Sequence, residues 1–219
     1  MLENIVNEIA RRDIERLKTY QSLLSFYQGQ QWAERPRWGE KHLTFNYARL
    51  FVDKITSYLM TGVSFAVDAI EDSETARKQA QRAEAALLDI YLHNNLEQLD
   101  LETETDCAVM GDAAYKVFWD SPAKTVRVTA PDIQGIFVWW QGDDPARIWR
   151  VASKYRLSAD EIERLYRQKP LGDTAAIIEV WTDGDFELYL DGELVESRPN
   201  PCGFIPFIIY PNMREAKKP

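Results

Sequence analysis

The feature of this sequence that most constrains its fold is a change of hydrophobic period near Gly111. Before that glycine, apolar residues recur at steps of three and four, the spacing of one face of an α-helix. After it they alternate, which is the spacing of a half-buried β-strand. The sequence therefore predicts an α+β fold, in which an α-helical first half packs with a mainly antiparallel β second half. We expect a helical part over residues 1–112 and a β-rich part over residues 113–219.

The first half is expected to open with a long amphipathic helix, whose apolar stripe is interrupted by Asp13 and ends at Tyr27. Its polar side carries both charge signs and is expected to be a solvated face with weak ion pairs. That side is formed by Glu8, Arg11, Arg12, Glu15, Arg16 and Lys18. Residues 63–69 alternate like a short strand. Two further helices are expected, one that starts at Asp72 or Ser73 and runs through Asn94, and one over residues 96–110.

Residues 46–62 form the most apolar of the expected helices. Asn46 can accept hydrogen bonds from the first helical turn, and Gly62 can take the left-handed conformation that closes the last one. A helix that is apolar around most of its circumference must be covered, either by its own domain or by a neighbouring subunit. We therefore expect the side chains of its main stripe to be nearly fully buried. These are Phe51, Val52, Ile55 and Leu59.

The second half reads as a series of hairpins. Turns are expected at residues 121–124 and, as the tight Asp-Gly pairs that hairpins prefer, at Asp183-Gly184 and Asp191-Gly192. A capping box at residues 158–161 predicts a short helix between strands. In the pair Trp139-Trp140, neighbouring side chains of a strand point to opposite faces, so at least one ring is expected in the core.

Composition excludes several classes of protein. The formal charge of −9 over 219 residues argues against a protein that grips nucleic acid by neutralising phosphates. Cys107 and Cys202 have no CxxC spacing and are expected to be small buried hydrophobes rather than nucleophiles. The sequence contains no signal peptide and no apolar run long enough to cross a bilayer. We therefore expect a protein of a reducing compartment that does not associate with membranes.

The search for catalytic chemistry identifies one candidate group of acids, Asp100, Glu102, Glu104 and Asp106. Glu102 and Asp106 would share one face of a helix and could hold a hard cation. The simpler interpretation is a solvated acidic face. His42 and His93 are isolated, and no phosphate-binding or dinucleotide-binding glycine motif is present in the sequence. An unrecognised metal-dependent enzyme that processes nucleic acids remains the alternative hypothesis.

Several short motifs follow one another along the chain in a defined order. The first two are Tyr27-Gln28-Gly29-Gln30-Gln31-Trp32 and the segment 46–62, with its Asn, Asp-Lys, Tyr-Leu and Gly. Downstream come Val109-Met110-Gly111-Asp112-Ala113-Ala114-Tyr115, the proline-containing stretch 130–140, Ile178-Glu179-Val180-Trp181-Thr182 and Gly203-Phe204-Ile205-Pro206-Phe207. Their order and spacing resemble the amino-terminal part of portal proteins of tailed bacteriophages, in the branch typical of siphophages of Gram-positive hosts.

The resemblance implies a non-enzymatic structural protein without cofactors. It implies a dodecameric ring at one capsid vertex, through which double-stranded DNA is packaged and ejected without being bound specifically. The implied partners are further copies of the chain and the capsid, terminase and head–tail connector proteins. The implied location is the virion, or the host cytoplasm when a prophage encodes the protein.

The resemblance also implies which part of such a protein is present and which residues matter. Both predicted parts, residues 1–112 and 113–219, correspond to the wing region. The stem, clip and crown are expected to be absent, so the chain is expected to be a truncated piece. The residues expected to serve subunit contact or structure are Asn46, Arg49, Asp53, Lys54, Tyr58 and Gly62.

Overall fold

The computed structural model of the protein describes residues 5–30, 32, 38, 40–60, 62–142 and 144–211, which fall into two compact units. The sheet unit combines residues up to Tyr20 with Pro131–Ile208. The helix unit combines Gln21–Ala130 with residues 209–211. Each unit is described by itself below.

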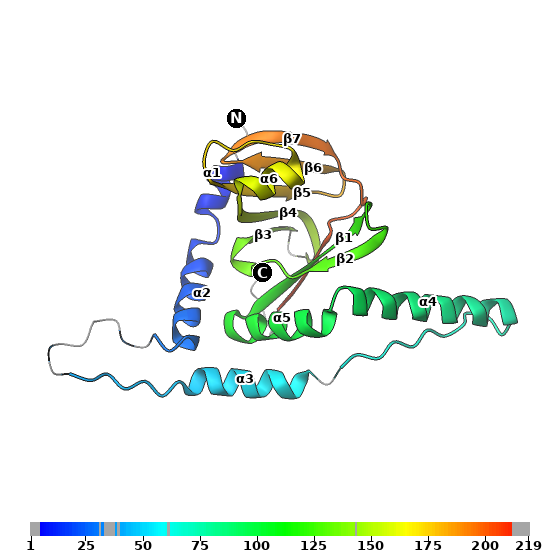
Figure 1. The fold of residues 1–219 in the computed structure, drawn as a ribbon, viewed down its shortest axis with the longest axis horizontal. Helices are drawn as coiled ribbons and strands as arrows, with labels where there is room; N and C mark the ends of the chain where they lie inside the picture. Colours follow the sequence, from blue (N-terminus) through cyan, green and yellow to red (C-terminus); the bar gives the residue numbers. More distant parts are fainter. Residues whose placement is uncertain are drawn as a thin grey trace. The chain divides into compact units, whose positions relative to one another are not determined.

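Helices occupy the first half of the chain and most strands the second, which confirms the predicted α+β class (Figure 1). The helices are α1 (Ile5–Arg11), α2 (Ile14–Tyr27), α3 (Tyr47–Leu59), α4 (Glu74–His93), α5 (Leu96–Met110) and α6 (Ala159–Tyr166), with a 3-10 turn, η1 (Ile133–Gly135). The strands are β1 (Asp112–Asp120), β2 (Thr125–Thr129), β3 (Ile136–Gln141), β4 (Asp144–Ser158), β5 (Thr174–Trp181), β6 (Asp185–Leu190), β7 (Glu193–Pro199) and β8 (Phe207–Pro211).

The sheet unit is built on an antiparallel meander of five strands in the order β3-β4-β5-β6-β7. One face carries a core in which Ile9 of α1 packs with Ile178 and Val180 of β5. On β5 the side chain of Glu179 points the other way, because neighbouring residues of a strand alternate between faces. Tyr166 of α6 reaches Glu179 there with its hydroxyl group, at 2.9 Å. Helices α1 and α6 therefore cover opposite faces of this sheet.

Local sequence signals explain the turns and caps of the sheet unit. Asp191 and Gly192 both have positive φ, 48° and 92°, as a tight hairpin turn between β6 and β7 requires. Ser158 accepts a hydrogen bond from the backbone N–H of Glu161, and the Glu161 carboxylate accepts one from the backbone N–H of Ser158. The predicted capping box at the start of α6 is therefore confirmed.

The helix unit centres on α5. Helices α3 and α4 and strand β1 all pack against it, and α4 also contacts β2 (Figure 1). The second sheet has the order β2-β1-β8, and its β1–β2 hairpin is the one expected from residues 121–124. Helix α5 ends at Gly111, whose φ of 100° closes the helix as predicted. Cys107 of α5 is a buried small hydrophobe, as expected, and burial raises the pKa of its thiol to about 11.

The long first helix of the prediction is in fact two helices. The break falls at Asp13, whose φ of 57° is left-handed. A short polar side chain tolerates that conformation better than most, and its carboxylate lies 3.3 Å from a guanidinium nitrogen of Arg16. Asp13 was recognised as an interruption of the apolar stripe, but the stripe resumes after it, so periodicity alone predicted one helix instead of two.

Two further boundaries differ from the prediction. Residues 63–69, all of which the structure describes, form no strand, because no neighbouring strand pairs with them there. Helix α3 ends at Leu59 with Met60 as its C-cap, although Gly62 does take a left-handed φ of 87°. An alternating pattern specifies a strand only where a partner edge is available.

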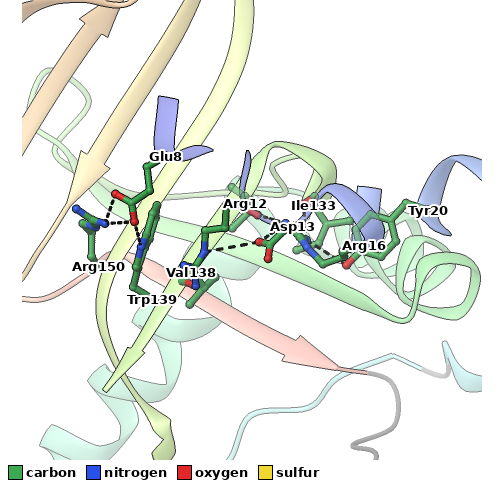
Figure 2. Close-up of polar contacts among 10 residues, drawn as sticks. Glu8, Arg12, Asp13, Arg16, Tyr20, Ile133, Val138, Trp139 and Arg150 are labelled. Atoms are coloured by element: carbon green, nitrogen blue, oxygen red, sulfur yellow. Dashed lines mark hydrogen bonds and ion pairs between the residues drawn. The ribbon is translucent and has the colours of Figure 1, made fainter. Parts of the chain in front are cut away.

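The polar side of the first two helices is a solvated face only in part. Lys18 and Glu15 form an exposed ion pair at 2.8 Å, as expected. The expectation is wrong for Glu8, Arg12 and Arg16, whose charged groups contact β3, β4 or η1 (Figure 2). Trp139 of β3 is buried, which confirms that one ring of the Trp139-Trp140 pair belongs to the core.

Gly135 marks a close approach of two backbone segments in the sheet unit. It ends η1, immediately before β3, and faces the backbone carbonyl of Lys154 in β4. A methyl group placed on Gly135 would lie far inside van der Waals distance of that oxygen. This position therefore requires glycine for space rather than for a special φ.

Candidate subunit-contact surface

The start of α3 is tied to the end of α2 through Asn46. Its side-chain oxygen accepts a hydrogen bond from the backbone N–H of Arg49 at 3.1 Å, which confirms the predicted N-cap. Its side-chain amide donates to the backbone carbonyl of Tyr27 at 2.7 Å. The chain turns just after Tyr27 at Gly29, whose φ is 81°. One residue thus caps α3 and fixes where α2 ends beside it.

Tyr27 also holds the side of α3. Its hydroxyl group donates to Oδ1 of Asp53 at 2.6 Å, and Nε of Arg49 lies 3.5 Å from Oδ2 of the same carboxylate. The Arg49 guanidinium lies over the Tyr27 ring, 5.8 Å from its centre. Burial raises the pKa of Tyr27, and the hydrogen bond to Asp53 raises it further. Asn46, Arg49 and Asp53 therefore converge on one tyrosine.

The other predicted residues lie elsewhere on the segment. Lys54 and Tyr58 pair with each other, the ammonium nitrogen 4.7 Å from the ring centre. Gly62 follows α3, and among the described residues no atom lies within 4 Å of a Cβ built on it. The six predicted residues thus form one cluster, one separate pair and one glycine. Sequence reasoning did not include Tyr27 among them, although its place in the motif that closes α2 was a usable signal.

Most of the apolar surface of α3 is exposed in the chain. The expectation that Phe51, Ile55 and Leu59 are buried is wrong, since 67% of Phe51 and 38% of Ile55 are accessible to solvent. Val52 is half-buried, and the buried residue of α3 is Thr56, at 2%. Thr56 belongs to the side that faces α5, and its hydroxyl group donates to the backbone carbonyl of Val52 at 3.0 Å.

The exposed side chains of α3 make one apolar surface, which we call the α3 surface. It consists of Tyr47, Leu50, Phe51, Ile55, Tyr58 and Leu59. Single exposed apolar residues need no explanation, but a concentration of large ones on one helix marks an interaction site. The periodicity correctly identified an apolar helix. Periodicity does not show whether the apolar side chains of α3 are covered by the same chain or by a neighbouring subunit.

The acidic candidates of α5 do not gather into a metal site in the structure. Asp100 accepts a hydrogen bond from the Tyr115 hydroxyl of β1, and Glu102 accepts one from the Gln98 side-chain amide at 2.8 Å. Within the described ranges, no three His, Cys, Asp or Glu side chains are placed so that they could hold a metal ion. In the same ranges, no helix has both the length and the apolar character needed to cross a bilayer.

Comparison with known proteins gives one family. A family model described as "Phage portal protein, SPP1 Gp6-like" matches residues 7–218, which is nearly the whole chain. No curated protein matches the chain significantly.

Proposed function

The chain belongs to the SPP1 Gp6-like family of phage portal proteins, and we propose that it acts as a subunit of the ring through which phage DNA is packaged and ejected. The match over residues 7–218 carries this proposal. It supports a structural role at the capsid vertex and a place in the virion. Capsid, terminase and head–tail connector proteins are the partners that we propose beside further copies of the chain.

We further propose that both parts of the chain, residues 1–112 and 113–219, serve as the wing region of the subunit. The α3 surface supports a role in subunit contact, because α3 offers large apolar side chains that the chain itself leaves uncovered. Apolar side chains, aromatic ones above all, form the centre of most protein interfaces. Tyr27 and the three residues that contact it, Asn46, Arg49 and Asp53, form what we call the Tyr27 cluster. This cluster would hold α3 in position, so its residues act as positioning residues beside the α3 surface.

We propose that DNA passes through the ring without being bound specifically. The family is structural and non-enzymatic, and we propose that this chain likewise has no catalytic activity and no cofactor. The formal charge of −9 supports passage, because a weakly repelling protein lets a polyanion slide, whereas a basic groove would hold it.

Sedimentation velocity over a range of protein concentrations tests the proposed contact. The Phe51→Ser/Leu59→Ser variant removes two anchors of the α3 surface that contribute little to the fold of the single chain. The matched control is Leu171→Ser, which removes an apolar side chain of the sheet unit that is 108% exposed. We expect the wild type and the control to sediment faster as concentration rises, and the α3 variant to stay monomeric with unchanged circular dichroism. Equal self-association of all three proteins would refute a role for α3, and so would a wild type that never self-associates.

A further inference from the structure

Strand β3 is an outer strand of the five-stranded sheet, and its outer edge is occupied by two arginine side chains (Figure 2). Arg16 donates from Nη2 to the backbone carbonyl of Ile136 at 2.7 Å, and Arg12 donates from Nη2 to that of Val138 at 2.8 Å. Ile136 and Val138 are two residues apart, so their carbonyl groups point to the same side of the strand. The arginines therefore take the hydrogen-bonding positions that another strand would use.

Both arginines are fixed in place by further contacts. The Arg12 guanidinium lies 4.6 Å from the centre of the Trp139 ring. Arg16 lies 5.1 Å from the centre of the Tyr20 ring and donates to its hydroxyl group at 3.2 Å. The carboxylate of Asp13 lies 3.9 Å from Nε of Arg12 and 3.3 Å from Nη2 of Arg16. The break between α1 and α2 thus places one carboxylate between the two guanidinium groups.

Glu8 provides a further contact between α1 and the sheet, to strands β3 and β4. Glu8 accepts a hydrogen bond from the indole N–H of Trp139 at 2.6 Å and one from Nη2 of Arg150 at 2.8 Å. Together with Ile5 and Ile9 in the core, this contact holds α1 on the sheet without the help of Arg12 or Arg16. α1 is therefore attached to the sheet by other contacts, and the contact of the two arginines with the strand edge needs a separate explanation.

We propose that Arg12 and Arg16 close the β3 edge against strand addition, and that the strand they exclude is β3 of a second copy of the chain. An outer strand with free backbone groups is a template for pairing with another chain. Residues 136–140 are all apolar, so neither charge nor proline within them would prevent such pairing. Two identical edges can pair antiparallel about a two-fold axis, since each supplies the same donors and acceptors.

The helix unit closes an edge in the same manner, with a different side chain. The side-chain amide of Asn94, which caps α4, donates to the backbone carbonyl of Val126 at 2.9 Å. Its oxygen accepts from the backbone N–H of Val128 at 3.0 Å. Val126 and Val128 are again two residues apart on the outer edge of a strand, here β2. This independent case supports the interpretation that helix side chains protect the strand edges of this chain.

The test replaces both arginines in a chain whose α3 surface is already disabled by Phe51→Ser/Leu59→Ser. In this background, association through α3 cannot mask association through β3, so the two proposals succeed or fail separately. Arg12→Met/Arg16→Met removes the donors and keeps the apolar stems. Lys18→Met/Arg77→Met is the matched control, because it removes two exposed positive charges that pair with Glu15 and Asp72 rather than with β3. Size-exclusion chromatography with light scattering gives the molar mass.

We expect the edge variant to form dimers with twice the molar mass of the monomer as concentration rises, while the control stays monomeric. Val138→Pro, added to the edge variant, should restore the monomer, because proline removes an N–H that points outward from β3 rather than into the pairing with β4. A folded edge variant that stays monomeric would overturn the proposal, and so would dimers that Val138→Pro leaves unchanged. If the double variant does not fold, the single variant Arg16→Met replaces it in the same test. This variant frees the backbone carbonyl of Ile136, while the Arg12 guanidinium keeps its contact with the Trp139 ring.

Discussion

The hydroxyl group of Tyr27 donates to Asp53 at 2.6 Å, so the last residue of α2 is bonded to the middle of α3. We expect Asp53→Ala to lower the free energy of unfolding of the single chain by about 0.5–1.5 kcal/mol, the usual net value of such a hydrogen bond. Arg49→Ala should cost less, about 0.2–0.5 kcal/mol, because it removes one exposed i,i+4 ion pair. Urea unfolding of both variants measures the difference. Equal costs would mean that Tyr27 gains nothing from Asp53.

The same two substitutions are expected to weaken self-association more than they weaken folding. Asp53 and Arg49 hold α3 against Tyr27, so their loss lets the α3 surface move while the single chain stays folded. Sedimentation velocity of both variants beside the wild type measures this effect. Wild-type association of both variants would show that the Tyr27 cluster is irrelevant to subunit contact.

Ile55 and Ile162 form a matched pair for testing which helix is buried. Ile55 of α3 is 38% exposed, and we expect Ile55→Ala to cost under about 1 kcal/mol in the single chain, since a half-exposed side chain loses little transfer free energy and leaves no cavity. Ile162 of α6 is 0% exposed, and Ile162→Ala should cost about 2–5 kcal/mol through lost burial and a residual cavity. Chemical denaturation gives both values. A larger cost at Ile55 would mean that α3 is covered within its own chain.

Glu179 is a buried carboxylate that accepts several hydrogen bonds, and it should be the most sensitive acid of the sheet unit. Its Oε1 accepts hydrogen bonds from Tyr155 at 2.7 Å and Tyr166 at 2.9 Å, and its Oε2 accepts one from Trp181 at 3.0 Å. Glu179→Ala removes the acceptor of all three hydrogen bonds from a buried network and should cost about 3–5 kcal/mol. Glu196→Ala, which removes an exposed ion pair with Arg198, should cost about 0–1 kcal/mol. Similar costs for the two variants would contradict the buried network.

Stability should fall at alkaline pH because of half-buried tyrosines. Burial, together with hydrogen bonds to Asp100 and Glu187, raises the pKa of Tyr115 and of Tyr189 from 10.0 to about 12. These pKa values are higher in the folded chain, so their stabilisation is fully present below pH 10 and is lost as pH rises toward 12. Urea unfolding at several pH values, with tyrosinate absorbance, measures the loss. Tyr115→Phe/Tyr189→Phe should flatten the slope, and an unchanged slope would assign the loss to other groups.

The chain is expected to bind duplex DNA no more tightly than about 1 µM near physiological salt, because it offers few clustered phosphate contacts. It is also expected not to cleave DNA in the presence of Mg²⁺ or Mn²⁺. Fluorescence anisotropy and a nuclease assay measure both. Metal-dependent cleavage that disappears in Glu102→Gln/Asp106→Asn would replace the structural function with the enzymatic alternative.

Features set by neighbouring residues could be predicted from the sequence. Ser158 and Glu161 cap α6 because the side chain of each accepts a hydrogen bond from the backbone N–H of the other, within one helical turn. Gly111 ends α5 and Asp191-Gly192 forms a hairpin turn because few other residues tolerate positive φ. Asn46 caps α3 for a similar local reason. The α+β class followed, since it depends on where such local patterns change.

Features set by distant partners could not be predicted. The apolar stripe of α3 was recognised, but Phe51 is exposed because α5 meets the Thr56 side instead. Arg12 and Arg16 occupy polar positions of an amphipathic helix, and nothing nearby in the sequence shows that carbonyl groups 126 and 120 residues away, respectively, accept their hydrogen bonds. Contacts of this kind depend on where the helix lies in the tertiary structure, and helical periodicity contains no information about that position.

Gly135 sets a limit on how this chain can diverge. The Lys154 carbonyl oxygen leaves no space for a side chain at position 135, so even alanine would have to push η1 away from β4. In a saturation library selected for folding, position 135 should retain only its original codon family, while the neighbouring half-buried Gln134 accepts many replacements. A glycine retained at position 135 in phages descended from this sequence would then reflect the crowded backbone alone. It would not be evidence that the position contacts DNA, the capsid or the packaging motor.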